Sequence, residues 1–334
     1  MSDLESQGSL IINEWIGREG DNFDWLNDSL SFEGWTIIDS RNISAEILSE
    51  WNGTGWFKSF IKVDEELINK PIPFKFDENY GALEFYLDDE LIDRLGTLSS
   101  IEANTRSEID HHAEILQFSD TLTHVFSVRY VNHNSTRFEK LDLNNGFQLQ
   151  LYNFDEYIRT EEEHEKIHTH IISVIVFLVS LSIVHLLLLV FYPAGQMNFY
   201  FTFIASSVAV FTLSNNAIEL FSNPDYLVIA YYIKELAWLF AYLCILKFSY
   251  SFTDKNSPKF LIVVLILALI IVTLSFFTSW SIEIFRSILS IIILLDYSRI
   301  VLIQKNKNQP VDLLLFGLGI FILMLFIQRE TFIN

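Results

Sequence analysis

The charge and the hydropathy of the chain change near residue 170, and this change limits the folds that the chain can adopt. Residues 1–170 contain 34 Asp and Glu against 13 Lys and Arg, a net charge of −21, whereas residues 171–334 contain 8 against 9, a net charge of +1. The mean hydropathy of the whole chain is nevertheless positive, at +0.31. The sequence therefore predicts an acidic, water-exposed half followed by a half that is embedded in a membrane.

The charge balance of the first half argues against one class of partner. Nucleic acids and anionic lipid surfaces are recognised by basic patches, and residues 1–170 carry a strong acidic excess. The chain has one cysteine, Cys244, so no intrachain disulfide can form. No cofactor-binding motif occurs either, and we expect no cofactor.

Six segments of the second half are long and apolar enough to cross ~30 Å of hydrocarbon as helices. Basic residues gather in the loops after the third and fifth segments, which indicates that these loops are cytoplasmic and the acidic half extracytoplasmic. The first residues do not form a signal peptide, so we expect that the chain lacks its natural start or that a signal was removed. We also expect a seventh helix after residue 334. The predicted spans are residues 171–192, 198–218, 226–248, 260–280, 284–304 and 311–328.

Residues 1–154 show the alternation of short antiparallel strands. In the segment WFKSFIKV, Phe57, Ile61 and Val63 alternate with Lys58 and Lys62. This period of two recurs in three later segments with turn residues between them, which predicts a β-sandwich with one face of each strand buried. Residues 155–170 read as a charged helix that leads into the transmembrane domain, residues 171–334.

Several of these segments resemble galactose-binding-like jelly rolls, such as the sugar-binding domains of glycosidases. The run from Gly55 to Phe60 is similar to their Gly-Trp-aromatic strand, and Leu83–Ile92 is similar to one of their hairpins, with Asp88-Asp89 where Asn-Gly is usual. Thr121–Asn132 is similar to a third strand. The opening strands of such jelly rolls are matched in this sequence by Trp15, the turn Gly20-Asp21 and Trp35.

The order of a jelly roll, a charged stalk and short-looped helices resembles the bacterial seven-transmembrane receptors with diverse intracellular signalling modules. This resemblance implies a protein of the bacterial inner membrane, with a sensor domain in residues 1–154 that binds an extracytoplasmic small molecule or carbohydrate. It also implies transmission through the helices to a cytoplasmic output domain or partner, and it makes a homodimer plausible. The expected function is signal transduction by a chain that is not itself an enzyme.

Three residues of the predicted sandwich are candidates for contact with the ligand. Trp56 offers an aromatic plate, and Lys58 and Arg129 offer directed polar groups, a combination that suits a sugar. The alternative interpretation is that Trp56 packs the sandwich edge and that the two cations offset neighbouring acids.

The stalk contains the zinc-protease pattern His-Glu-x-x-His at His164, Glu165 and His168. Zinc hydrolysis also needs a third ligand and an open position for water, and neither is evident in the sequence. A metal site and a metalloprotease remain alternatives, and a solvated stalk helix is the favoured interpretation.

Polar residues inside the predicted spans are costly in lipid and are typical of sites where helices contact one another. They are interpreted either as a polar switch for signal transmission or as static contacts between helices. A small-solute transporter or channel is a second functional alternative, although only three spans carry such residues. The residues are Asn215, Asn216, Lys234, Glu235, Asp296 and Arg299.

Overall fold

The computed structural model describes most of residues 4–251 and a few short pieces after them. All statements of structure below concern these residues. The described ranges are 4, 7–27, 33–41, 43, 51–77, 80–108, 112–135, 138, 145–192, 196–217, 223–251, 266, 270, 291–292, 295–299 and 302.

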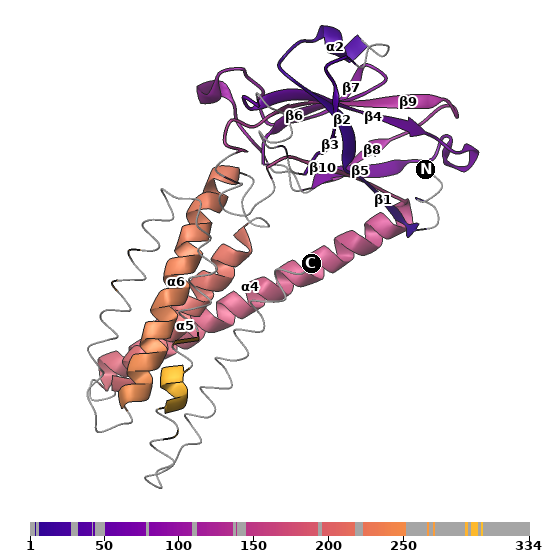
Figure 1. Cartoon of the computed structure of the whole chain (residues 1–334). Coiled ribbons are helices and arrows are strands. Elements are labelled where there is room, and N and C mark those ends of the chain that lie inside the picture. The colour runs from indigo at the N-terminus through magenta and orange to yellow at the C-terminus, as the bar shows by residue number, and fades with distance from the viewer. Residues whose placement is uncertain are drawn as a thin grey trace. The chain divides into compact units, whose positions relative to one another are not determined.

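The first part of the chain forms two antiparallel sheets (Figure 1). One sheet has the order β1-β10-β5-β8, and the other has the order β3-β2-β4-β9-β6-β7. The sandwich predicted for residues 1–154 thus agrees with the structure. The strands are β1 (Ser9–Ile12), β2 (Glu14–Glu19), β3 (Thr36–Asp39), β4 (Thr54–Lys62), β5 (Ile72–Asp77), β6 (Ala82–Leu87), β7 (Glu90–Leu95), β8 (Glu114–Leu116), β9 (Thr123–Val131) and β10 (Gln148–Tyr152).

The core lies between the two sheets and is rich in aromatic rings. Phe74 of the four-stranded sheet contacts Phe85 of the six-stranded sheet, with ring centroids 5.1 Å apart. Phe147 contacts both Trp15 at 5.4 Å and Phe57 at 5.3 Å. These rings are almost completely buried. Aromatic pairs in such edge-to-face arrangements add to the stabilisation from burial alone.

The hairpin between β6 and β7 turns through two aspartates. Asp88 and Asp89 both have positive φ, +47° and +70°, which is the conformation of a two-residue type I′ turn. The Asp88 carboxylate accepts a hydrogen bond from the Val125 amide at 2.8 Å and also contacts Nδ1 of His124. The Asp89 side chain is exposed.

A single helix, α4 (Phe154–Phe191), follows the last strand directly. Its first turn is capped by Asn153, whose side-chain oxygen accepts the Glu156 amide at 2.8 Å. Asp155 and Glu156 are favourable there because a helix N-terminus carries partial positive charge. The predicted stalk, residues 155–170, and the first predicted span therefore form one uninterrupted helix, as Figure 1 shows.

The predicted six-span bundle is wrong. Within the described residues, two helices are long and apolar enough to cross a membrane, Phe154–Phe191 and Tyr226–Phe248. The second predicted span forms α5 (Gln196–Asn215), which is not one of them. The third predicted span lies in α6 (Pro224–Ser251). The last three predicted spans fall mostly outside the described residues.

We expect Asp89→Gly to raise the free energy of unfolding of the sandwich by up to about 1 kcal/mol, because glycine adopts a positive φ without steric cost. The measurement is urea denaturation of the detergent-solubilised chain, followed by tryptophan fluorescence. Asp88→Gly is the matched control. Asp88→Gly also places a glycine at a positive φ, but it removes the hydrogen bond to the Val125 amide. Its free energy of unfolding should therefore not rise. Equal stabilisation by both variants would contradict this account of the turn.

Candidate ligand-binding site

The three candidate ligand residues lie together on the outer face of the six-stranded sheet. Trp56 of β4 is the direct partner of Arg129 of β9, and Lys58 lies two positions further along β4. Phe57, between them in sequence, points to the opposite face and belongs to the core. The alternation of a strand thus separates an apolar inner face from a polar outer face.

These three side chains are buried, although they lie on the outer face. Trp56 is 0% exposed, Lys58 is 2% exposed and Arg129 is 9% exposed. The connection between β2 and β3 covers them. We call its described residues 20–27 the cover; they include the short helix α2 (Asp24–Asn27).

The cover contacts each of the three candidates. The ring of Phe23 packs edge-on against Trp56 with centroids 5.5 Å apart. Lys58 donates a hydrogen bond from Nζ to the carbonyl oxygen of Leu26 at 3.1 Å. The guanidinium of Arg129 lies 4.6 Å from the Phe23 ring centroid, a cation–π distance.

Arg129 is the centre of an ionic network across the sheet. Its Nε and Nη2 atoms donate to the two carboxylate oxygens of Asp21, both at 2.7 Å. Its Nη1 atom donates to Glu84 on the neighbouring strand β6 at 3.1 Å. Glu84 also binds Arg94 at 2.6 Å and accepts the Tyr86 hydroxyl at 2.9 Å. Two cations and two carboxylates therefore balance one another within this network.

The network changes the proton affinity of its members. Burial alone would lower the pKa of Arg129, but the hydrogen bonds to Asp21 and Glu84 outweigh it and raise that pKa above its ordinary value. Burial, followed by the hydrogen bond to Glu84, raises the pKa of Tyr86 to about 12. Arg129 is therefore charged and Tyr86 neutral throughout the physiological range.

Two buried polar atoms on this face have no hydrogen-bond partner among the described residues. They are Nε1 of Trp56 and Oγ of Ser127, and both side chains are completely buried. Ser127 is the strand partner of Lys58 and lies two positions from Arg129 on β9. Each unsatisfied group costs about 1–3 kcal/mol of desolvation.

The outer surface of the cover carries exposed aromatic rings. Phe23 is 51% exposed, and Trp25 and Trp35 are half-buried and contact each other at 6.2 Å. The guanidinium of Arg18 lies 4.3 Å from the centroid of Trp25. We call Phe23, Trp25 and Trp35 the aromatic patch.

Sequence reasoning missed Asp21, Phe23, Glu84 and Tyr86 as members of this site. Glu84 and Tyr86 could have been found, because the alternation of ALEFYL places them on the outer face of the predicted hairpin. Asp21 and Phe23 carry no such signal. Only the fold of the cover over the sheet brings them to Arg129 and Trp56.

The histidine pattern of the stalk lies on α4, where His164 and Glu165 are exposed and His168 is half-buried. Throughout the described part of the chain, no three His, Cys, Asp or Glu side chains are grouped so that they could hold a metal ion. The choice between a metal site and a solvated stalk helix stays a prediction.

The polar residues of the second half have defined contacts where they are described. Arg299 binds Asp296 at 2.7 Å and also donates to the hydroxyl of Tyr250, which in turn donates to Asp296 at 2.7 Å. Sequence reasoning found the first pair and missed the tyrosine. Lys234 lies 4.8 Å from the ring centroid of Tyr231.

The remaining predicted residues do not join that group. Glu235 is buried on α6 beside Lys234. Asn215 is the last residue of α5, and Asn216 follows it; both are half-buried. The two interpretations of these residues, a polar switch and static contacts between helices, both stay predictions.

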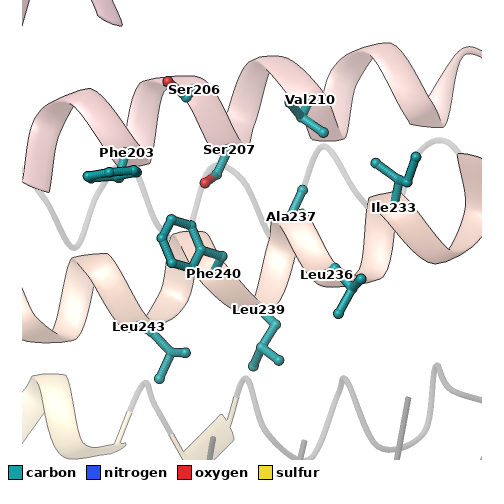
Figure 2. A pocket seen from close by; sticks show the side chains of 10 residues that line it. All are labelled: Phe203, Ser206, Ser207, Val210, Ile233, Leu236, Ala237, Leu239, Phe240 and Leu243. Atoms are coloured by element: carbon teal, nitrogen blue, oxygen red, sulfur yellow. The ribbon is translucent and has the colours of Figure 1, made fainter. Parts of the chain in front are cut away.

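A groove between α5 and α6 has a volume of about 440 Å³ (Figure 2). Among the described residues its lining is almost entirely apolar, and the hydroxyls of Ser206 and Ser207 are the polar side-chain groups of that part. The lining residues are Phe203, Ser206, Ser207, Val210, Ile233, Leu236, Ala237, Leu239, Phe240 and Leu243.

No protein family and no curated protein matches the sequence. Solved structures of glycosidases match the sandwich: a glycosyl hydrolase family 2 member from Bacteroides cellulosilyticus at 16% identity and a TM-score of 0.30, and a β-glucuronidase from Bacteroides uniformis at 14% and 0.31. These matches cover 44% and 43% of this chain. The chain spans about a fifth of either structure, 21% and 18%.

These matches correct three predictions. The neighbours are glycosidases rather than seven-transmembrane receptors, and the described residues supply two candidate spans rather than six, so the receptor family and the receptor function are both wrong. The expectation that the chain is not itself an enzyme is corrected as well, because the neighbours are glycosidases. At this identity and TM-score, their activity is not carried over to this chain.

We expect Arg129→Gln to lower the free energy of unfolding of the sandwich by about 3 kcal/mol, because it leaves Asp21 and the buried Glu84 without their shared cation. Urea denaturation monitored by tryptophan fluorescence measures the change. Arg159→Gln is the control, since Arg159 pairs with Glu156 on the exposed surface of α4 and such pairs contribute about 0–1 kcal/mol. Similar effects of the two substitutions would show that the buried network adds no special stability.

Proposed function

We propose that this protein is a carbohydrate-binding β-sandwich that α4 tethers to a membrane. One observation carries the proposal: the sandwich, with an aromatic patch on its outer surface, continues without a break into a helix whose second half exposes apolar side chains. The two parts of the proposal, tether and ligand, rest on different residues and are tested separately.

The tether follows from the pattern of exposure along α4. Beyond the charged residues 155–170, the helix is almost purely apolar, yet Phe177, Val190 and Phe191 are 66%, 65% and 72% exposed. A core helix of a water-soluble protein is mostly buried, and a signal sequence lies near the N-terminus; α4 fits neither description. Lipid is the solvent that suits such a surface.

The position of the sandwich relative to the membrane is part of the proposal. Lys247, Lys255 and Lys259 follow α6 or lie near its end, and the excess of Lys and Arg marks cytoplasmic loops. We keep the extracytoplasmic side of a bacterial inner membrane, expected from the sequence, as the proposed place of the sandwich. This orientation requires an odd number of crossings between the sandwich and these lysines, so α5 would have to cross the membrane as well as α4 and α6.

The ligand class follows from the aromatic patch. Phe23, Trp25 and Trp35 present ring faces and edges, with Arg18 and Asp21 close by. Sugars have apolar C–H faces that pack on rings and hydroxyls that need directed polar partners. Trp56, which the sequence predicted as the aromatic plate for the ligand, is buried and packs against Phe23 of the patch.

We expect the full chain to stay with the membrane fraction after extraction at alkaline pH with carbonate, because transfer of the apolar half of α4 into water is unfavourable. In intact inner-membrane vesicles of known orientation, protease should reach the sandwich from the extracytoplasmic side only. Recovery of the chain in the supernatant would contradict the tether, and cleavage from the cytoplasmic side would contradict the orientation.

We expect Phe23→Ala to weaken binding of oligosaccharides by about tenfold, because stacking on one ring contributes about 0.5–1.5 kcal/mol. The measurement is calorimetry with the detergent-solubilised chain and a panel of neutral and acidic oligosaccharides. Phe154→Ala is the matched control, since Phe154 is 50% exposed and lies outside the patch at the start of α4. No binding of any oligosaccharide by the unmodified chain would refute the ligand proposal.

A further inference from the structure

We propose that the sugar taken by this surface carries a carboxylate, which binds Arg129 in place of the carboxylate of Asp21. The inference rests on the proposed carbohydrate function and narrows it to acidic sugars. It concerns the buried outer face of the six-stranded sheet, which the aromatic patch borders.

The geometry of the Arg129–Asp21 pair is the first argument. Two parallel N–H···O bonds of 2.7 Å join the guanidinium to both carboxylate oxygens, which is the arrangement by which arginine recognises a planar carboxylate of any origin. The Asp21 side chain is 26% exposed, against 11% for Arg129. The carboxylate therefore reaches Arg129 from the solvent side, where a ligand would also arrive.

The charge of the face without Asp21 is the second argument. Glu84 stays bound to Arg94, Tyr86 and the Nη1 atom of Arg129 and cannot serve the other two nitrogens. When Asp21 leaves, the two cations of the network, Arg129 and Arg94, face the single carboxylate of Glu84, so an anion is the replacement that restores the balance.

The unpartnered polar atoms are the third argument, and they separate a sugar acid from a simple carboxylate. Nε1 of Trp56 can donate and Oγ of Ser127 can donate or accept, and neither has a partner among the described residues. Both lie on the face of Arg129, Trp56 directly opposite it and Ser127 two positions away. Hydroxyls of a bound sugar ring would satisfy both atoms, whereas acetate brings none.

The proposed exchange moves one short segment of the cover. Gly20 starts the cover with φ +110°, a conformation that glycine adopts freely, and its amide donates to the carbonyl of Thr54, which holds this residue on β4. Asp21 and Phe23 follow within three residues and are exposed at the surface. The exchange requires these two residues to swing away from Arg129 and Trp56 while Gly20 stays in place.

The test compares a uronic-acid oligosaccharide with the same oligosaccharide after reduction of its carboxyl groups, by calorimetry on the full detergent-solubilised chain. Asp21→Asn removes the competing carboxylate and keeps the size of the side chain. We expect it to bind the uronic-acid probe about tenfold more tightly than the unmodified chain, and to leave binding of the reduced probe unchanged.

Asp24→Asn is the matched control. Asp24 lies on the same cover, and its substitution changes the net charge by the same amount, whereas the carboxylate bound to Arg129 is that of Asp21. An equal gain in both variants would overturn the inference, since it would reflect net charge alone. Thermal unfolding of each variant checks that the sandwich is intact.

Three further outcomes separate this inference from the proposed function. Binding of neutral sugars without binding of the uronic-acid probe would refute the inference and leave the carbohydrate function standing. Failure of every sugar would refute both. Displacement of the probe by acetate at equal carboxylate concentration would refute the inference, because the sugar ring would then contribute nothing.

Discussion

The pairing of β4 with β9 determines most of what this molecule presents on either side of its larger sheet. Nine consecutive residues pair, from Thr54 with Val131 to Lys62 with Thr123. This register points Phe57 and Val128 inward together and Trp56 and Arg129 outward together. A slip of one residue would reverse both faces and place the Arg129 guanidinium in the aromatic core, where an unpaired charge is prohibitively costly. The core and the ionic network therefore enforce the same register from opposite sides.

The outer face of the six-stranded sheet carries charged side chains that are nevertheless buried. Arg129 can be buried because Asp21, Glu84 and the Phe23 ring satisfy it from three directions. Loss of one member of a buried ionic network lowers the stability of a protein strongly. The intact network, however, contributes little more stability than apolar packing in its place. Its retention at the border of an aromatic patch is consistent with a role in binding, where an exchangeable carboxylate has a use that a hydrophobic contact lacks.

The transition from sandwich to membrane depends on a short junction. β10 ends at Tyr152, Asn153 caps the following helix, and α4 then continues for 38 residues through the change from acidic to apolar sequence. The rings of Tyr152 and Tyr157 contact each other at 6.1 Å across this junction. Burial raises the pKa of both tyrosines, so both remain neutral under physiological conditions. The start of the helix is thus held to the last strand by packing as well as by its cap.

The sequence by itself determined the strands of the sandwich, the charged start of α4 and its apolar continuation, because period-two alternation and hydropathy are local properties of the chain. It also selected Trp56, Lys58 and Arg129 as candidates for ligand contact, and the strand register brings them to one face. It overestimated the number of spans, since the described residues supply two candidates. Only the tertiary structure decided that these three residues are buried and that Asp21 and Phe23 complete their site. Those contacts join residues as far as 108 positions apart, and no local pattern records where the cover between β2 and β3 comes to rest.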